Sequence, residues 1–178
     1  MLANEYIALR PLRMEDKNDL ARLLNNKKIW DNLRDFVPYP YTEQDAVDFI
    51  SYTHKELPDH TFAITHQDKF AGVIGLIPQH DVFRKSMELG FWIGEPFWGK
   101  GIVTIAVKLI SQHAFKTMGI SRLFSHVYEY NIASMRVLEK CGFQHEGISR
   151  KAIIKNEKLW DLHEYGLLKG DFSPLNHS

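Results

Sequence analysis

This 178-residue sequence has a single cysteine, no long apolar run and no excess of charge of either sign. The single cysteine, Cys141, excludes an intrachain disulfide and fits a reducing compartment. No apolar run approaches the ~18 residues that a transmembrane helix requires. The first residues also lack the continuous apolar stretch of a secretory signal peptide. We therefore expect a cytoplasmic protein that does not associate with membranes.

The charges balance, with 22 basic and 22 acidic residues. A neutral balance argues against a protein that coats nucleic acid or docks on an anionic membrane. The apolar content of 44% and the charged content of 25% are ordinary for a soluble globular protein. The length favours one domain, which we place at residues 1–170, followed by a tail at 171–178. We expect a monomer or a homodimer and no nucleic-acid partner.

Metal-binding and covalent-nucleophile motifs are missing as well. The nine histidines form no compact ligand pattern such as H-E-x-x-H. His145 and His163 each precede a glutamate, and adjacent residues of a strand point to opposite faces. We predict no metal site, and we interpret Cys141 as a buried apolar residue rather than an acyl-enzyme nucleophile. His80 and His126 are candidates for an acceptor pocket, with surface or packing roles as the alternative.

Hydrophobic periodicity predicts alternating strands and helices. The expected strands cover residues 6–12, 61–66, 70–78, 87–94, 121–128, 144–154 and 158–168. The expected helices cover residues 16–25, 43–50, 102–118 and 132–141, with an aromatic, proline-rich loop at 29–41 and a hairpin turn at 155–157. Thr42 and Asp45 form a capping pattern before the second helix. This order predicts an α/β (α+β) fold with a mixed, mostly antiparallel seven-stranded sheet flanked by helices.

The segment GEPFWGKGIVT, residues 94–104, joins the fourth expected strand to the longest expected helix. The first N–H groups of a helix have no internal partner, and together with the helix dipole they attract anions. Glycines allow the backbone to approach a phosphate closely. The segment therefore indicates a phosphate or pyrophosphate site, and a turn with a structural role alone is the competing interpretation.

Two familiar nucleotide motifs are excluded in this segment. The magnesium-nucleotide motif G-x-x-x-x-G-K-[ST] needs a hydroxyl where Gly101 stands. The dinucleotide motif G-x-G-x-x-G needs a glycine where Thr104 stands.

Residues 97–104, FWGKGIVT, resemble the acetyl-coenzyme A loop of the GNAT acetyltransferases, [QR]-x-x-G-x-[GA], although Trp98 and Val103 depart from it. The run MELGFWIGEPFWGKG and the segment NIASMRVLEKCGF, residues 131–143, are similar to the branch of ribosomal-protein N-terminal acetyltransferases. IALRPLRMED near the start and WDLHEYGLLKGDF near the end also match its first and last strands. The resemblance thus extends over nearly the whole chain.

The resemblance implies that acetyl-CoA binds as a co-substrate in a V-shaped gap between the strands expected at 87–94 and 121–128. It implies that the pantetheine arm is held near the end of the first of these strands, and the pyrophosphate by the loop that follows. The implied cofactor-binding residues are Phe91, Trp92, Ile93, Gly94, Trp98, Gly99, Lys100, Gly101, Ile102, Val103, Thr104, Asn131 and Ser134. Asn131 is also expected to cap its helix.

The implied reaction is direct attack of an amine on the thioester in a ternary complex. A backbone N–H near Trp92 would stabilise the developing oxyanion. A base or a water chain must take the proton of the amine, and Glu88 is our candidate for that base. Leu138 stands where other members of the family place a tyrosine acid; Tyr128 and Tyr130 are alternatives for that role.

The loop at 29–41 would cover the acceptor side in this family. Trp30, Arg34, Phe36 and Tyr39 are the implied substrate-binding residues, with a hydrophobic lid as the competing interpretation. We expect the acceptor to be a protein N-terminal α-amine. A small amine such as an antibiotic or polyamine is the alternative acceptor, and a non-catalytic CoA-binding regulatory domain is the alternative function.

Overall fold

A computed structural model describes residues 2–3, 6–56 and 60–174 of the chain. Of the tail expected at 171–178, residues 175–178 lie outside the described residues. Among the helices in the described part, none has the length and apolar character needed to cross a membrane.

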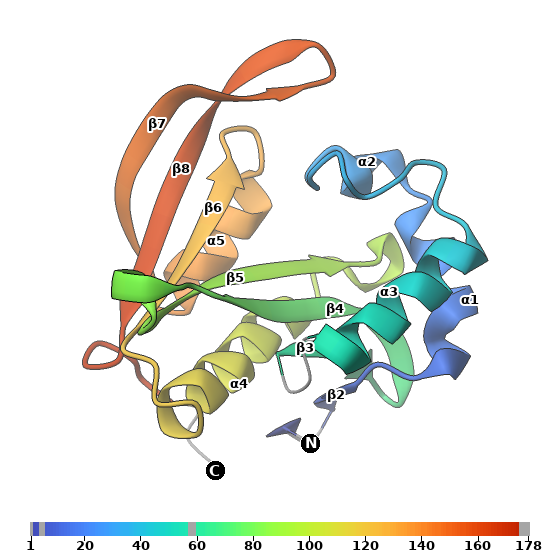
Figure 1. Ribbon diagram of the computed structural model, residues 1–178, viewed down its shortest axis with the longest axis horizontal. Helices are drawn as coiled ribbons and strands as arrows, with labels where there is room; N and C mark the ends of the chain where they lie inside the picture. Colours follow the sequence, from blue (N-terminus) through green and yellow to red (C-terminus); the bar gives the residue numbers. More distant parts are fainter. Residues whose placement is uncertain (1, 4–5, 57–59, 175–178) are drawn as a thin grey trace. The chain divides into compact units, whose positions relative to one another are not determined.

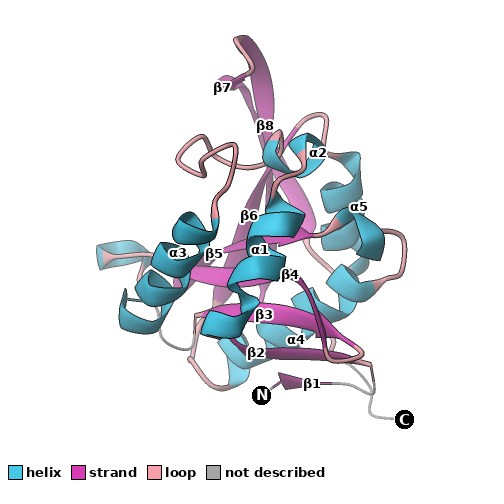
Figure 2. Ribbon diagram, turned by 90° about the vertical axis from the view of Figure 1, so that its right-hand side faces the viewer, coloured by secondary structure: helices cyan, strands magenta, loops and turns pink. Residues whose placement is uncertain are grey.

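The observed elements follow the predicted order. The strands are β1 (Leu2–Ala3), β2 (Ile7–Pro11), β3 (Thr61–His66), β4 (Lys69–Pro78), β5 (Ser86–Ile93), β6 (Arg122–Tyr128), β7 (Gln144–Lys155) and β8 (Lys158–Leu168). The α-helices are α1 (Lys17–Leu24), α2 (Lys27–Trp30), α3 (Glu43–Glu56), α4 (Ile102–Lys116) and α5 (Ile132–Lys140). Short 3₁₀ turns cover Met14–Asp16, Asp81–Phe83 and Glu95–Phe97. Figures 1 and 2 show these elements.

The strands hydrogen-bond in the order β1-β2-β3-β4-β5-β6-β8-β7. Pairs β1/β2, β2/β3, β3/β4, β6/β8 and β7/β8 are antiparallel, whereas β5 and β6 are parallel. The two-residue strand β1 adds one strand to the seven expected from the sequence. The predicted class, a mixed and mostly antiparallel sheet with flanking helices, is confirmed.

The chain divides into two compact units, and the first comprises residues 1–75 and 91–102. In this unit α1 and α3 lie against each other (Figure 1). Their apolar faces pack on β3 and β4, because Ala63 of β3 and Phe70 and Val73 of β4 belong to the same buried cluster as Leu20 and Ile50. Helix and sheet thus bury one shared core, as the 3.6-residue and two-residue periods require.

The start of α3 confirms the capping prediction. The hydroxyl of Thr42 accepts from the N–H of Asp45 at 3.1 Å, and the carboxylate of Asp45 accepts from the N–H of Thr42 at 2.7 Å. This reciprocal pair satisfies two backbone donors that a helix start would otherwise leave open. It also lowers the pKa of Asp45, because the Thr42 hydroxyl and backbone N–H both favour the carboxylate.

The second unit comprises residues 76–90 and 103–178. Its central strand, β6, alternates strictly: Leu123, Ser125 and Val127 are buried, and the side chains between them are half-buried. Strands β7 and β8 form the long hairpin coloured orange to red in Figure 1. One face of β6 therefore belongs to the core of this unit, and the other remains partly open to solvent.

Two local predictions are wrong. Ile29 and Trp30, expected in a loop, belong to α2, because the side chain of Asn26 accepts from the N–H of Lys28 and caps a short helix. Lys155, expected in the hairpin turn, is the last residue of β7 and is buried. The turn itself is limited to Asn156 and Glu157, both with positive φ.

Candidate active site

The loop after β5 reaches α4 through two left-handed glycines. A 3₁₀ turn at Glu95–Phe97 is followed by Gly99 with φ of 74° and Gly101 with φ of 73°. Residues with a Cβ adopt this region of φ at a steric cost that glycine does not have, so glycine favours the turn into the helix at both positions. A Cβ added at either glycine would meet no atom within 4 Å, so this side of the loop is open.

The amides of this loop are available to a ligand. In the described part of the chain, the N–H groups of Gly99, Lys100 and Gly101 donate to no backbone or side-chain acceptor. The first N–H groups of α4, from Ile102 onward, have no acceptor within the helix. Consecutive open N–H groups at a helix start can hold the oxygens of a pyrophosphate. The phosphate site indicated by the sequence stays a prediction, and this row of open amides suits it.

Trp98, the residue that departs from the family pattern, braces the loop. Its indole Nε1 donates to the carbonyl oxygen of Ile93 at 2.8 Å, while its ring remains 42% exposed. This bond joins the end of β5 to the turn before Gly99. The indole therefore fixes where the glycine loop begins, a role that the sequence alone did not indicate.

The end of β5 presents alternate backbone groups to opposite sides. The N–H of Gly94 donates to the carbonyl of Ala71 on β4 at 2.8 Å, and the carbonyl of Trp92 lies directly against Gly72 of the same strand. Because the N–H and C=O groups of successive residues alternate in direction, those of Phe91 and Ile93 point away from β4. For the oxyanion role expected near Trp92, the neighbouring N–H groups of Phe91 and Ile93 therefore have the suitable direction.

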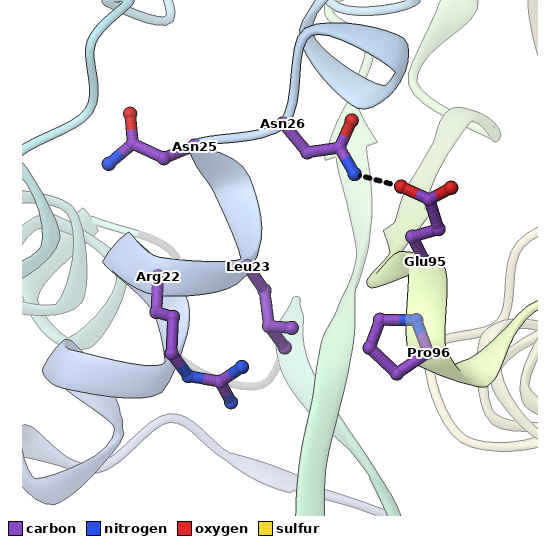
Figure 3. A pocket seen from close by; sticks show the side chains of 6 residues that line it. All are labelled: Arg22, Leu23, Asn25, Asn26, Glu95 and Pro96. Carbon is purple, nitrogen blue, oxygen red and sulfur yellow. Dashed lines mark hydrogen bonds between the residues drawn. The ribbon is translucent and has the colours of Figure 1, made fainter.

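A cavity of about 370 Å³ lies beside the start of this loop (Figure 3). It is lined by Arg22, Leu23, Asn25, Asn26, Glu95 and Pro96. Sequence reasoning did not single out these residues, because α1 and the loop are about seventy positions apart and only the fold joins them.

Glu95 connects the cavity to α2. Its carboxylate accepts from Asn26 Nδ2 and from Lys28 Nζ, each at 2.5 Å (Figure 3 shows the first of these bonds). These two donors lower the pKa of Glu95, with Lys28 contributing most. A carboxylate held in this way ties the 3₁₀ turn before the glycines to the segment that carries the expected acceptor residues.

Two of the four expected acceptor residues, Trp30 and Tyr39, pack ring against ring. Trp30 Nε1 donates to the carbonyl of Val37 at 2.8 Å, and its ring lies 5.4 Å from that of Tyr39. Phe36, by contrast, is 79% exposed, and Arg34 is also exposed. The structure therefore brings the rings of Trp30 and Tyr39 together, while Tyr39, Phe36 and Arg34 are all exposed to solvent.

In the second unit, the predicted base Glu88 contacts a histidine. Its Oε1 lies 3.3 Å from Nδ1 of His126 on the neighbouring strand β6. The register places Glu88 opposite Phe124, and His126 is two residues further along the same face. Sequence reasoning considered both residues but did not pair them, because 38 positions separate them.

The pairing of β5 with β6 stops at this point. The last paired positions are Glu88 and Phe124. Immediately beyond them the hydroxyl of Ser125 donates to the carbonyl of Leu89 at 2.9 Å, so a side chain replaces the next ladder contact. Glu88 and His126 thus lie where the regular parallel ladder ends.

The helix after β6 begins as predicted. The side chain of Asn131 accepts from the N–H of Ser134 at 3.2 Å and caps α5. Leu138, at the position of the family's tyrosine, is fully buried and offers no proton donor. Tyr128 and Tyr130 pack edge-to-face with ring centroids 5.8 Å apart, and Tyr130 also packs on Trp160.

Cys141 is placed as the sequence indicated. It is buried, and its Sγ donates to the carbonyl of Thr104 at 3.4 Å. Burial raises the pKa of the thiol from 9.0 to about 11, so the thiolate needed for nucleophilic attack is scarce at neutral pH.

Two histidines approach each other on the β7–β8 hairpin. His163 Nδ1 lies 3.1 Å from His145 Nε2. Within residues 2–3, 6–56 and 60–174, no group of three or more His, Cys, Asp or Glu side chains is arranged to hold a metal ion.

The loop and the strand ends can now be compared with known proteins. The model of the acetyltransferase (GNAT) domain matches residues 7–144, which is more than half of the chain. The chain belongs to the GNAT acetyltransferase family. It is therefore an acetyltransferase, and its relatives include proteins of the ribosomal-protein acetyltransferase branch.

Three similar proteins illustrate the range of this GNAT family. The putative ribosomal N-acetyltransferase YdaF of Bacillus subtilis is 30% identical, over 95% of this chain and 94% of its own. The spermidine N(1)-acetyltransferase of Escherichia coli K12 is 27% identical, over 79% of this chain and 74% of its own. The structure of the microcin C7 self-immunity acetyltransferase MccE, in complex with acetyl-CoA and AMP, is 27% identical with a TM-score of 0.79, over 93% of each chain.

Proposed function

We propose that this GNAT enzyme transfers the acetyl group of acetyl-CoA to a primary amine by direct attack in a ternary complex. The observation that carries this proposal is the row of open amides at Gly99–Gly101 and the start of α4. That row suits a pyrophosphate, and MccE, a related enzyme, is known in complex with acetyl-CoA. No metal is required, because the thioester is already activated and the enzyme mainly has to position the reactants.

The proposed cofactor contacts are mostly backbone groups. The N–H groups of Gly99–Thr104 would bind the pyrophosphate, and Lys100 would add a positive charge beside it. Phe91 and Ile93 would offer N–H groups to the pantetheine arm and the thioester carbonyl. In the second unit, Asn131 and Ser134 are the proposed polar contacts of the cofactor.

The acceptor we propose is a protein N-terminal α-amine. The similarity to the ribosomal N-acetyltransferase YdaF over 95% of the chain supports it. The spermidine acetyltransferase, which is also similar, supports a small polyamine as the alternative. The proposed acceptor contacts are Trp30 and Tyr39, whose rings pack together, and the exposed side chains of Phe36 and Arg34.

Calorimetric titration of the purified protein tests the cofactor. We expect saturable binding of acetyl-CoA and no binding of magnesium-ATP, because Gly101 offers no hydroxyl to the metal. Release of free CoA is then followed with a serine-starting peptide, an alanine-starting peptide and spermidine. Turnover of a peptide supports the N-terminal acceptor, and turnover of spermidine alone supports the polyamine. Binding of acetyl-CoA without turnover of any amine would favour a regulatory CoA-binding protein; binding of neither nucleotide would refute the loop assignment.

A further inference from the structure

Glu88 and His126 form a carboxylate–imidazole pair at the end of the β5/β6 ladder. The carboxylate oxygen lies 3.3 Å from Nδ1 of the ring, within reach of an Nδ1–H donor. A neutral imidazole that donates through Nδ1 carries its lone pair on Nε2. In the described part of the chain, Nε2 of His126 has no hydrogen-bond partner. The ring is therefore oriented by the carboxylate and retains one basic nitrogen.

Accessibility separates the two members of the pair. The side chain of His126 is 30% exposed, whereas that of Glu88 is 14% exposed and has one oxygen directed at the ring. An incoming amine therefore reaches the imidazole more easily than the carboxylate. The rings of Phe124 and His126 also meet edge-to-face with centroids 5.4 Å apart.

Carboxylates of both neighbouring strands lie near His126. Glu88 faces it from β5, and Glu164 lies directly across from it on β8, where its Oε1 accepts from Ser149. On its own strand the nearest charged residue of the same face is Arg122, which is engaged by Glu146 of β7. The nearest cation on this face is thus paired with a carboxylate of its own, and the imidazole of His126 lies between two strands that each carry a carboxylate.

We propose that His126 takes the proton of the acceptor amine through Nε2 and that Glu88 is its positioning residue. This inference rests on the proposed acetyl transfer. The amine nitrogen forms the C–N bond to the thioester carbon, and the C–S bond breaks with its electron pair leaving on the CoA thiolate. The proton on the nitrogen passes to Nε2, and the imidazolium later releases it to solvent. Neither an oxidant nor a metal enters this step.

The pH dependence of kcat distinguishes this arrangement from a carboxylate base. Activity of the wild-type enzyme with a serine-starting peptide should rise with pH as His126 loses its proton. His126→Gln should lower kcat about 100-fold and remove this rise, the ascending limb of the pH profile. Glu88→Gln should keep the limb and lower kcat less than His126→Gln does, because an amide holds the Nδ1–H tautomer of the ring less firmly than a carboxylate. The titration of the peptide amine is the same in every variant, so the differences belong to the enzyme.

The opposite pattern would overturn the proposal. If Glu88 takes the proton itself, Glu88→Gln removes the limb and His126→Gln keeps it. His163→Gln is the matched control: this histidine lies on β8 opposite Val127, on the other face of the sheet, and its loss should change neither kcat nor the profile. Each variant should bind acetyl-CoA as the wild type does, which excludes a simple folding defect.

A second measurement does not depend on turnover. NMR spectra of ¹⁵N-labelled histidines, with His126 assigned from the His126→Gln spectrum, should show the Nδ1–H tautomer of its neutral ring in the wild type and less of this tautomer when Glu88 becomes glutamine. An unchanged tautomer population would mean that the two residues do not interact and would refute the pair. If the population changes but no amine is acetylated, the pair stands and the proposed acetyl transfer fails, so the two failures are distinguishable.

Discussion

Helices α4 and α5 begin in opposite ways. The residue before α4 is Gly101, which has no side chain to cap the helix, and the loop amides in front of it stay open. The residue before α5 is Asn131, whose side chain accepts from the N–H of Ser134. A cap satisfies a donor that would otherwise need water or a ligand. An uncapped helix start is therefore locally less stable than a capped one, but its free N–H groups can bind an anion.

The largest effect is expected when a negative charge is placed at the uncapped start of α4. Gly101→Glu should weaken acetyl-CoA binding by about 100-fold or more, roughly 3 kcal/mol, because a carboxylate and a side chain then occupy the anion position. Calorimetry measures the loss. Gly101→Ala separates strain from charge, since alanine at a φ of 73° costs about 1 kcal/mol without adding charge.

A control substitution places the same charge elsewhere. Gly170→Glu lies on an open position where an added Cβ meets no atom within 4 Å, and it should leave affinity unchanged. Equal losses for Gly101→Glu and Gly170→Glu would show that charge at a distance, not occupation of the loop, is responsible.

At the capped start of α5, a substitution should change mainly the free energy of unfolding. Asn131→Ala removes the acceptor for the N–H of Ser134 and should lower the free energy of unfolding by about 1 kcal/mol. Urea denaturation measures this change. Asn131→Asp keeps an acceptor oxygen and should retain most of the stability. If alanine leaves stability unchanged, the two helix starts do not differ in the way described.

Loss of the Trp98 hydrogen bond, just before the glycine loop, should weaken acetyl-CoA binding less than Gly101→Glu does. Trp98→Phe keeps an aromatic ring but removes the bond from Nε1 to the carbonyl of Ile93. One neutral hydrogen bond contributes about 1 kcal/mol, so we expect acetyl-CoA affinity to fall about five-fold. Stopped-flow binding kinetics would show whether the loop becomes slower to bind. A loss as large as that of Gly101→Glu would mean that Trp98 contacts the cofactor itself.

The smallest effect on stability is expected from the ionisation of the Cys141 thiol. Cys141 follows the last residue of α5, and its thiol donates to a carbonyl in the first turn of α4. Its folded pKa of about 11 lies above the ordinary value of 9.0. The neutral thiol is therefore kept in both states below pH 9, and its contribution to stability is lost only as the pH rises toward 11. Iodoacetamide should leave the native protein unmodified at pH 8, and rapid alkylation there would contradict the assigned burial.

Local features account for what the sequence predicted well. The Thr42–Asp45 capping box, the two left-handed glycines of the loop and the Asn131 cap each involve residues no more than a few positions apart. The alternating burial of β6 likewise follows from a two-residue period. Such features depend on neighbouring residues alone, and for that reason the order of the elements and the position of the loop could be predicted.

The errors and omissions have a common physical cause. The short helix α2 depends on Asn26, whose amide group also reaches Glu95 on a distant turn. The cavity beside α1 and the packing of Trp30 on Tyr39 likewise depend on how separate segments pack. Neither propensity nor periodicity describes which side chains meet across such distances.

The amino-acid sequence by itself determined the family, the order of strands and helices, and the place of the two glycines beside which the backbone amides are open. Only the tertiary structure decided that Glu88 faces His126, that Trp98 holds the carbonyl of Ile93, and that the cavity is bordered by both α1 and the loop. The reason is that backbone sites are specified by residues adjacent in the chain, whereas side-chain sites depend on the register of strands that the chain brings together after folding.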